Sequence, residues 1–154
     1  MSLIAHPDSG LLLVASPSEG GTGLLAASLA CCCDCPCCPC EQYVATVGDV
    51  TGGFGDQCNE IEGTYTLNKQ VNCGPWTGRN QFQVAGTLSQ FTDSDGLCYM
   101  RLRIGPALAP AQADYIVRSN TWNCAGCNTM TLDYGSVTGI CTWPDTVQVC
   151  CNDY

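Results

Sequence analysis

The chain has 154 residues, 15 of them cysteines, and only 12% of its residues are charged, with a net charge of -9. This acidic balance excludes the usual classes of nucleic-acid partner and argues against an anionic membrane surface, and no apolar run is long enough to predict a membrane span. The cysteine share is typical of secreted scaffolds, so we expect an extracellular location or one on a cell or virion surface.

Residues 1–30 form an apolar arm with two near-repeats, "SGLLLVAS" at 9–16 and "TGLLAAS" at 22–28. The first is predicted to be a strand because turn residues bound a short apolar run, and the second fits a strand or a short helix. A strand that is apolar on both faces needs cover on both sides, either from its own domain or from a neighbouring subunit. The match to an export leader is poor, because no basic residue precedes the apolar part. The predicted contact residues are Leu11, Leu12, Leu13, Val14, Leu24 and Leu25.

Residues 31–40, "CCCDCPCCPC", form a segment with seven cysteines in ten positions. Adjacent cysteines rarely bond each other, so some members are expected to form disulfides with the following domain or with another chain. Fifteen is an odd number, so complete pairing within one chain is impossible. The disulfide candidates are Cys31, Cys32, Cys33, Cys35, Cys37, Cys38, Cys40, Cys58, Cys73, Cys98, Cys124, Cys127, Cys141, Cys150 and Cys151.

Two other uses of these thiols stay open. Cys37 and Cys40 with Cys124 and Cys127 would supply a four-thiolate zinc set, and the crowded spacings also suit softer ions such as copper. The C-x-x-C spacing of Cys124 and Cys127 is found in redox motifs, but the surrounding pattern is β rather than βαβ. Because His6 is the only histidine, disulfides are favoured, and no metal or cofactor is predicted.

Residues 41–154 alternate as β-strands do, and they form the third predicted region of the chain. Arg101 and Arg103 alternate with apolar residues, which indicates a strand with one solvated face, and Asp95-Gly96 predicts a hairpin. Short strands between Gly-rich turns predict an all-β fold, namely a disulfide-rich β-sandwich of jelly-roll type behind an extended apolar N-terminal arm. The predicted strands are 42–47, 63–68, 81–91, 98–104, 114–119, 129–134 and 145–151.

No constellation of catalytic side chains stands out, so no enzyme activity is predicted. Glu60 and Glu62 are spaced as a carboxylate pair on one strand face, but such pairs are usually a solvated edge. The stretch "DSDG" at 93–96, with Asp49 and Asp56, offers oxygen ligands for calcium, although a hairpin turn explains it better.

Short motifs in the β domain resemble those of a known group of proteins. "GTYTL" at 63–67 with Cys58 upstream, "PWTG" at 75–78 and "CTWPDTVQVCC" at 141–151 look like cysteine-rich β domains of uncharacterised bacterial surface and phage-associated proteins. The resemblance covers residues 58–151 and implies no activity and no catalytic residues. In its mode of assembly, an apolar arm ahead of a β domain is similar to the donor-strand arms of bacterial pilins. The cysteine segment between the arm and the domain departs from the usual pilin pattern.

These features predict a structural subunit that assembles with copies of itself into an extracellular or surface filament or shell. The arm would insert into a neighbouring subunit, and disulfides would lock it. One alternative is a secreted carbohydrate-binding β-sandwich that uses Trp76, Trp122 and Trp143, although large rings more often fill a core. Another alternative is a metal-thiolate protein that binds zinc or copper.

Overall fold

The structure is a computed structural model of the chain. It divides into two units, Met1–Asp34 and Cys35–Tyr154. All described residues belong to the second unit, and they are 37–52, 58–105, 112–134, 136 and 138–153. The predicted arm contacts, from Leu11 to Leu25, therefore lie outside the described residues.

Strands make up most of the described secondary structure, which confirms the all-β prediction. Each predicted strand corresponds to an observed one, with shifts at the ends. The elements are β1 (Gln42–Val47), β2 (Thr51–Gly52), η3 (Asn59–Ile61), β3 (Gly63–Lys69), β4 (Trp76–Arg79), β5 (Ala85–Thr92), β6 (Cys98–Ile104), β7 (Ala113–Arg118), η4 (Ser119–Thr121), β8 (Cys127–Leu132), β9 (Cys141–Thr142) and β10 (Thr146–Cys151).

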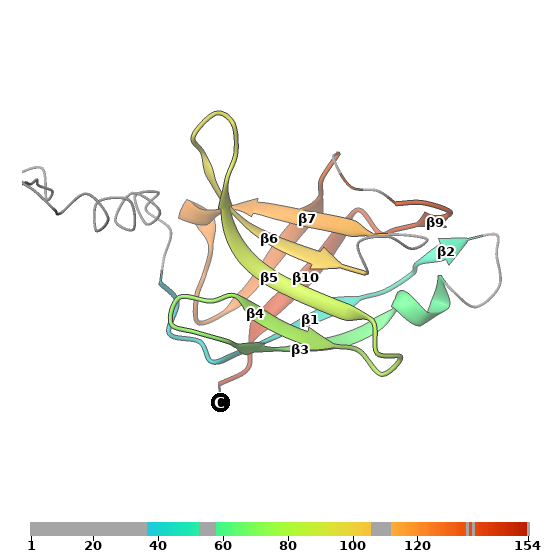
Figure 1. Cartoon of the computed structure of the whole chain (residues 1–154), viewed down its shortest axis with the longest axis horizontal. Helices are drawn as coiled ribbons and strands as arrows, with labels where there is room; N and C mark the ends of the chain where they lie inside the picture. The colour runs from blue at the N-terminus through green and yellow to red at the C-terminus, as the bar shows by residue number, and fades with distance from the viewer. Residues whose placement is uncertain (1–36, 53–57, 106–111, 135, 137, 154) are drawn as a thin grey trace, which may run out of the picture. The chain divides into compact units, whose positions relative to one another are not determined.

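Eight antiparallel strands close into one barrel in the circular order β1-β3-β4-β5-β6-β7-β8-β10, so strands that are adjacent in the sheet follow one another along the chain (Figure 1). Closure depends on β1, which pairs with β3 on one side and with β10 on the other. Tyr43 of β1 lies opposite Leu67 in the first pairing and opposite Cys151 in the second. β2 and β9 form a separate two-stranded sheet.

The β-sandwich prediction differs from this architecture. A sandwich and a barrel share the same alternation of inward and outward residues along each strand, and they differ in whether the first and last strands of the sheet pair. That pairing joins residues that are far apart in the sequence, and strand periodicity carries no information about it. The eight strands of the main sheet thus close on themselves instead of forming two packed sheets.

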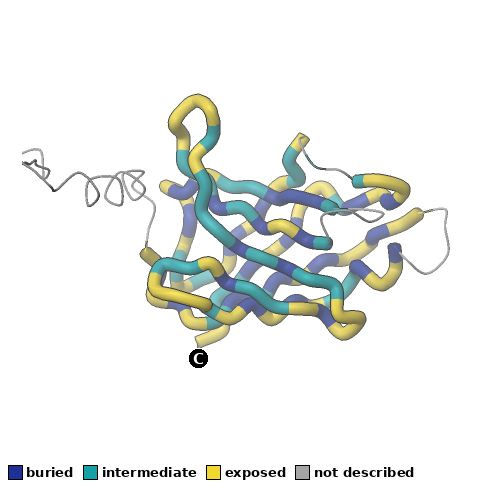
Figure 2. Tube along the Cα trace, viewed as in Figure 1, coloured by how far each residue is buried: buried dark blue, intermediate teal, exposed yellow. Residues whose placement is uncertain are grey.

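The barrel interior is filled by large side chains. Tyr43, Tyr65, Trp76 and Tyr115 are all fully buried, and buried residues alternate with exposed ones along the strands (Figure 2). An eight-stranded barrel is just wide enough for side chains to fill, and aromatic rings bury the most area per residue. The core of this domain is therefore the inside of the barrel.

Two glycines allow close approaches within the barrel, and a Cβ atom on the first of them, Gly78, would overlap the Thr66 backbone carbonyl. Gly78 of β4 and Gly86 of β5 lie opposite each other in register. A Cβ atom on Gly86 would lie 3.0 Å from the Tyr65 ring and 3.3 Å from the Leu67 side chain. The absence of a side chain at this position allows both neighbours to pack across the inner face of β5.

The predicted hairpin at Asp95-Gly96 is confirmed as the connection between β5 and β6. The Asp93 carboxylate accepts hydrogen bonds from the backbone N–H groups of Asp95 and Leu97, both at 2.9 Å. Gly96 has a φ of 79°, in the left-handed region that favours glycine. Asp93 therefore stabilises the turn with one carboxylate oxygen, Oδ1.

Candidate functional site

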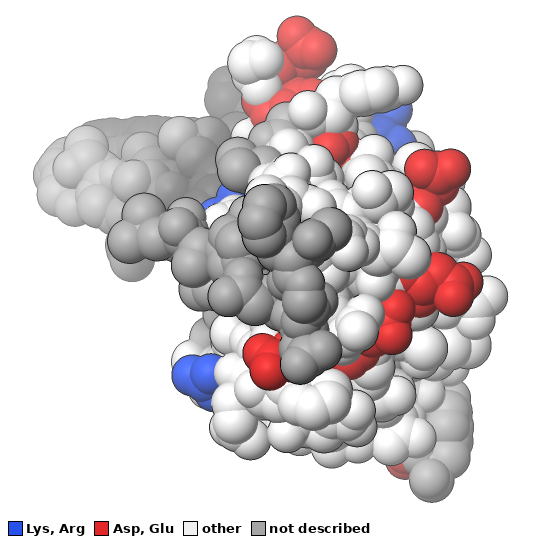
Figure 3. Space-filling model, turned by 90° about the vertical axis from the view of Figure 1, so that its right-hand side faces the viewer, with Lys and Arg blue, Asp and Glu red and all other residues white. Residues whose placement is uncertain are grey.

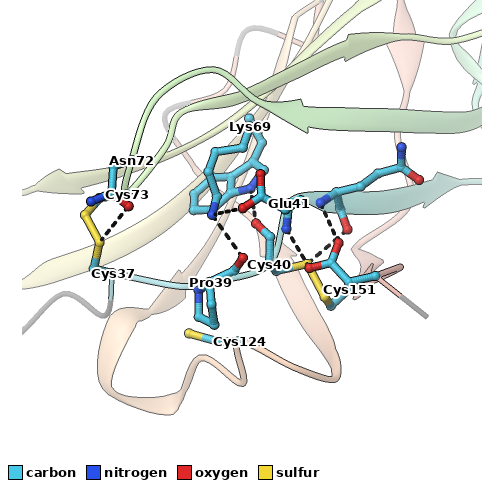
Figure 4. Close-up of polar contacts among 12 residues, drawn as sticks. Cys37, Pro39, Cys40, Glu41, Lys69, Asn72, Cys73, Cys124 and Cys151 are labelled. Atoms are coloured by element: carbon cyan, nitrogen blue, oxygen red, sulfur yellow. Dashed lines mark hydrogen bonds and ion pairs between the residues drawn. A yellow bond between two sulfur atoms is a disulfide. The ribbon is translucent and has the colours of Figure 1, made fainter.

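The end of the cysteine-rich segment together with Glu41, residues 37–41, is bonded to the barrel at three of its five positions, and we call it the root segment (Figure 4). It reaches three places that are far apart in the sequence: the β3–β4 loop, the loop before β8 and the end of β10. The three disulfides are Cys37–Cys73, Cys38–Cys124 and Cys40–Cys151.

Two further disulfides join described cysteines. Cys58–Cys141 ties the start of η3 to β9, and Cys127–Cys150 links β8 to β10. Cys98 is also disulfide-bonded. The remaining predicted candidates, which are Cys31, Cys32, Cys33 and Cys35, lie outside the described residues.

The pairing bears on the zinc hypothesis. All four members of the predicted thiolate set, Cys37, Cys40, Cys124 and Cys127, are in disulfides with other partners, so they present no thiolates in this state. Cys124 and Cys127 bond to different cysteines rather than to each other, so they do not form a C-x-x-C redox disulfide. The sulfurs of Cys40 and Cys151 lie within 4.8 Å of an Asp153 oxygen, but they too are bonded to each other.

An aromatic cluster lies beneath the root segment at this end of the barrel. The Trp76 Nε1–H donates to the Cys40 carbonyl at 2.8 Å, and the Trp122 Nε1–H donates to the Tyr43 hydroxyl at 3.1 Å. The Tyr43 ring packs edge-on against both tryptophans, and its hydroxyl donates to the Cys124 carbonyl. Burial raises the pKa of Tyr43 above its usual value, although the hydrogen bond from Trp122 opposes this shift. Backbone carbonyls of the disulfide-bonded residues are thus held by core side chains.

The three tryptophans are core residues. Trp76, Trp122 and Trp143 are exposed to 0%, 7% and 4%, which confirms their predicted burial. A carbohydrate platform needs an exposed coplanar pair of rings, and these side chains do not form one.

The single lysine of the chain also fastens the root segment. The Lys69 side chain is only 9% exposed, and its ammonium group donates to the Pro39 carbonyl and to the Glu41 carboxylate, both at 3.0 Å. The same group lies 5.9 Å from the centroid of the Trp76 ring. The Glu41 side chain is 76% exposed, so the ion pair itself is well solvated.

We expect Lys69→Met to lower the free energy of unfolding by about 1–2 kcal/mol, because the Pro39 carbonyl loses its partner while the aliphatic stem is kept. Glu41→Gln is the matched control and should change stability by less than about 0.5 kcal/mol, since exposed ion pairs contribute little. Urea unfolding at low and high salt measures both. Equal effects of the two variants, both lost at high salt, would show that the ion pair matters and the carbonyl contact does not.

A hollow of about 490 Å³ lies near the other end of the barrel, where β8 ends and β10 begins. Carboxylates, hydroxyls and one aromatic ring line it, and we call it the acidic hollow. Its polar lining residues are Thr131, Asp133, Tyr134, Ser136, Thr138 and Asp145. The sequence analysis missed this site, because the pairing of β8 with β10 brings its residues together from separate turns.

The predicted pair of carboxylates is not on a strand. Glu60 lies in η3, and Glu62 follows this helix and accepts a hydrogen bond from the Val50 backbone N–H at 2.7 Å. The expected strand face is therefore wrong, because the chain turns between the two residues. Of the proposed calcium ligands, Asp56 lies outside the described residues.

Among the described residues, no helix is long and apolar enough to cross a membrane. Comparisons with protein-family models, with curated proteins and with solved structures found no match to this chain. The five disulfides between described cysteines point to an oxidising compartment.

Proposed function

We propose that this chain is a non-enzymatic structural subunit that assembles with copies of itself into an extracellular or surface filament or shell, with residues 1–30 as the connector. The observation that carries this proposal is the covalent attachment of the root segment to the barrel. Cys37, Cys38 and Cys40 each bond to a different part of the domain.

The attachment suits a connector that bears force. A pull on the chain ahead of Cys37 reaches the β3–β4 loop, the loop before β8 and the end of β10 through covalent bonds. Without these bonds the same pull would act on the hydrogen bonds of β1, each of which contributes only about 1 kcal/mol net. A simple tether has no need of three bridges within four residues, whereas a subunit joined to its neighbour through this segment does.

The closed barrel changes the expected mode of connection. A donor strand adds to an unpaired sheet edge, and the eight-stranded sheet has none because closure pairs every strand on both sides. We therefore propose that the arm attaches by burying its apolar side chains rather than by extending this sheet. Six such side chains supply roughly 9–18 kcal/mol gross, against an association cost of about 4–15 kcal/mol.

Deletion of residues 1–30 tests the proposal. We expect the truncated protein to remain monomeric and to keep its β structure, because the barrel strands all lie between Gln42 and Cys151. The full chain should form particles larger than a monomer in the same buffer. Analytical ultracentrifugation, electron microscopy and far-UV circular dichroism of both proteins measure the two expectations.

Two results would count against the proposal, and they differ in meaning. A full chain that stays monomeric at all concentrations removes the structural role. A truncated chain that assembles like the full one keeps the structural role but removes the arm as connector.

A further inference from the structure

Arginines and aromatic rings form an ordered stack on the outer face of β5, β6 and β7. The Arg101 guanidinium lies 4.7 Å from the centroid of the Phe91 ring, and the Arg118 guanidinium lies 5.7 Å from that of Tyr99. The two rings stack on each other with their centroids 5.4 Å apart. We call these four side chains the arginine–aromatic ladder. The register explains it, because Phe91 is opposite Tyr99, which is opposite Arg118.

The two ladder arginines have no anionic partner among the described residues. The Arg101 Nε atom is buried and forms no hydrogen bond, which is unusual for a buried polar atom. Arg103, the next outward residue of β6, differs, because it donates twice to the Asp114 carboxylate at 2.8 Å. The rings thus hold two cationic groups in place without a counter-charge from the described residues, in a chain whose net charge is -9.

The acidic hollow has the opposite property. The carboxylates of Asp133 and Asp145 accept no hydrogen bond and form no ion pair within the described part of the chain, and the Tyr134 ring beside them is fully exposed. Acidic side chains outnumber basic ones on the face seen in Figure 3, which is the side of the molecule that carries β2 and β9.

Arg118 and Asp133 are too far apart to pair within one chain. Arg118 ends β7, whereas Asp133 follows β8, and these strands are antiparallel neighbours. The Asp133 N–H donates to the Asp114 carbonyl at 2.8 Å, so Asp133 lies beside the start of β7. Arg118 lies four positions along β7 from Asp114, which is about 13 Å of strand, and Arg101 lies between these levels because it is opposite Ile116.

We propose that the arginine–aromatic ladder of one copy docks against the acidic hollow of the next copy. This inference rests on the proposed structural function and names a surface for it. Guanidinium and carboxylate groups form directional, charge-assisted hydrogen bonds, and the exposed Tyr134 ring adds an apolar contact. Because the two surfaces differ, the contact is head-to-tail, and it repeats into a filament wherever the rotation between copies does not close a ring. It also offsets the repulsion between subunits that each carry a net charge of -9.

A charge-swap experiment with the full, oxidised chain tests the contact. The first variant carries Arg101→Glu and Arg118→Glu, and the second carries Asp133→Lys and Asp145→Lys. Each variant alone should assemble at least about tenfold more weakly than the wild type, because like charges then face each other. An equimolar mixture should assemble again, since each reversed surface meets a complementary one on the other variant.

Matched controls place the same charges elsewhere. Arg79→Glu and Asp95→Lys change exposed residues outside both surfaces and should leave assembly unchanged. Wild-type assembly should weaken as salt rises from about 0.1 M to about 1 M, because the screening length falls from about 10 Å to about 3 Å. Circular dichroism confirms that each variant is folded.

The outcomes separate the two proposals. Both variants assembling like the wild type, or a mixture that stays as weak as its components, would overturn the ladder–hollow contact while the structural role remains. A wild-type chain that never assembles would remove the structural role, and the contact with it.

Discussion

Replacing Cys58 and Cys141 together by alanine should destabilise the barrel more than replacing Cys40 and Cys151, although the second pair is further apart in the sequence. The separations are 83 and 111 residues. A disulfide stabilises a protein mainly by restricting the unfolded chain, and the effect grows with the loop that the bond closes. Sequence separation alone would therefore rank the two bonds in the opposite order.

The other disulfides reverse this order. In the unfolded chain, Cys40 and Cys151 are already connected by a short covalent path that crosses the disulfides Cys38–Cys124 and Cys127–Cys150. This path contains only the chain pieces 38–40, 124–127 and 150–151. That bond therefore restricts little that is not already restricted.

No comparably short covalent path connects Cys58 and Cys141 through the other disulfides. A shortest path between its ends runs through the pieces 40–58 and 141–151, which the disulfide Cys40–Cys151 joins. The Cys58–Cys141 bond therefore closes a much longer loop.

We expect the Cys58/Cys141 double variant to lose about 4 kcal/mol of unfolding free energy and the Cys40/Cys151 variant about 2–3 kcal/mol. Guanidinium unfolding of both double variants, with the other disulfides verified by mass analysis, measures the difference. A larger loss for Cys40/Cys151 would mean that contacts of the root segment, rather than loop closure, determine the effect. Removing Cys38–Cys124, Cys40–Cys151 and Cys127–Cys150 together should lower the free energy of unfolding by more than the sum of the three single effects. Each of these bonds shortens the loop that the other two close, so any one of them can be lost at a smaller cost while the others remain.

Local patterns in the sequence account for most of the strands. Arg101 and Arg103 face outward and Met100 and Leu102 face inward in β6, as their alternation predicts. The hairpin at Asp95-Gly96 followed from the same local signals. These features depend on neighbours within a few residues, and a single sequence contains that information.

β4 was missed because its four residues, Trp76–Arg79, show no alternation. Gly78 contributes no side chain to the pattern, and a Cβ atom at this position would overlap the Thr66 backbone carbonyl of the neighbouring strand β3. A glycine that serves packing therefore looks like a turn residue in the sequence. The start of β5 was misplaced for a related reason, since Asn80 accepts hydrogen bonds from the N–H groups of Phe82 and Val84 and holds them in a turn.

The candidate sites depend on long-range pairing, which no local pattern encodes. Cysteine spacing indicated that members of the 31–40 segment bond to distant partners, but it could not select Cys73, Cys124 and Cys151. The acidic hollow joins the turn at Asp133 to Asp145 through the pairing of β8 with β10, and the ladder joins three strands. Neither has a signal in the sequence beyond the charge of its residues.

Alkaline pH should unfold this protein over a narrow range. Burial raises the pKa of Tyr43, Tyr65 and Tyr115 above the ordinary value of 10 for tyrosine. Their hydroxyls donate to the backbone carbonyls of Cys124, Ile61 and Pro144, so each must stay protonated to keep its bond. The negative charge of Asp145 raises the pKa of Tyr115 further, because it opposes a second anion nearby.

The sign of the pH dependence follows from these directions. The folded-state pKa values lie above the unfolded value, so the neutral tyrosines contribute no pH dependence below about pH 10. Above that pH the unfolded chain releases protons that the folded chain retains, and stability falls by about 1.4 kcal/mol per pH unit for each tyrosine, or about 4 kcal/mol for three. A domain with the usual stability of about 5–15 kcal/mol should then unfold within a few pH units above 10.

Urea unfolding at about pH 9, 10 and 11 measures this slope, and the absorbance of tyrosinate should rise together with the loss of β structure. Tyr115→Phe should reduce the slope by about 1.4 kcal/mol per pH unit, even if the lost hydrogen bond lowers stability at neutral pH. Tyr134→Phe, which alters a fully exposed ring, is the matched control and should leave the slope unchanged. If tyrosinate forms in the folded barrel without loss of β structure, the hydroxyls inside the barrel are accessible to hydroxide, and burial does not hold them neutral.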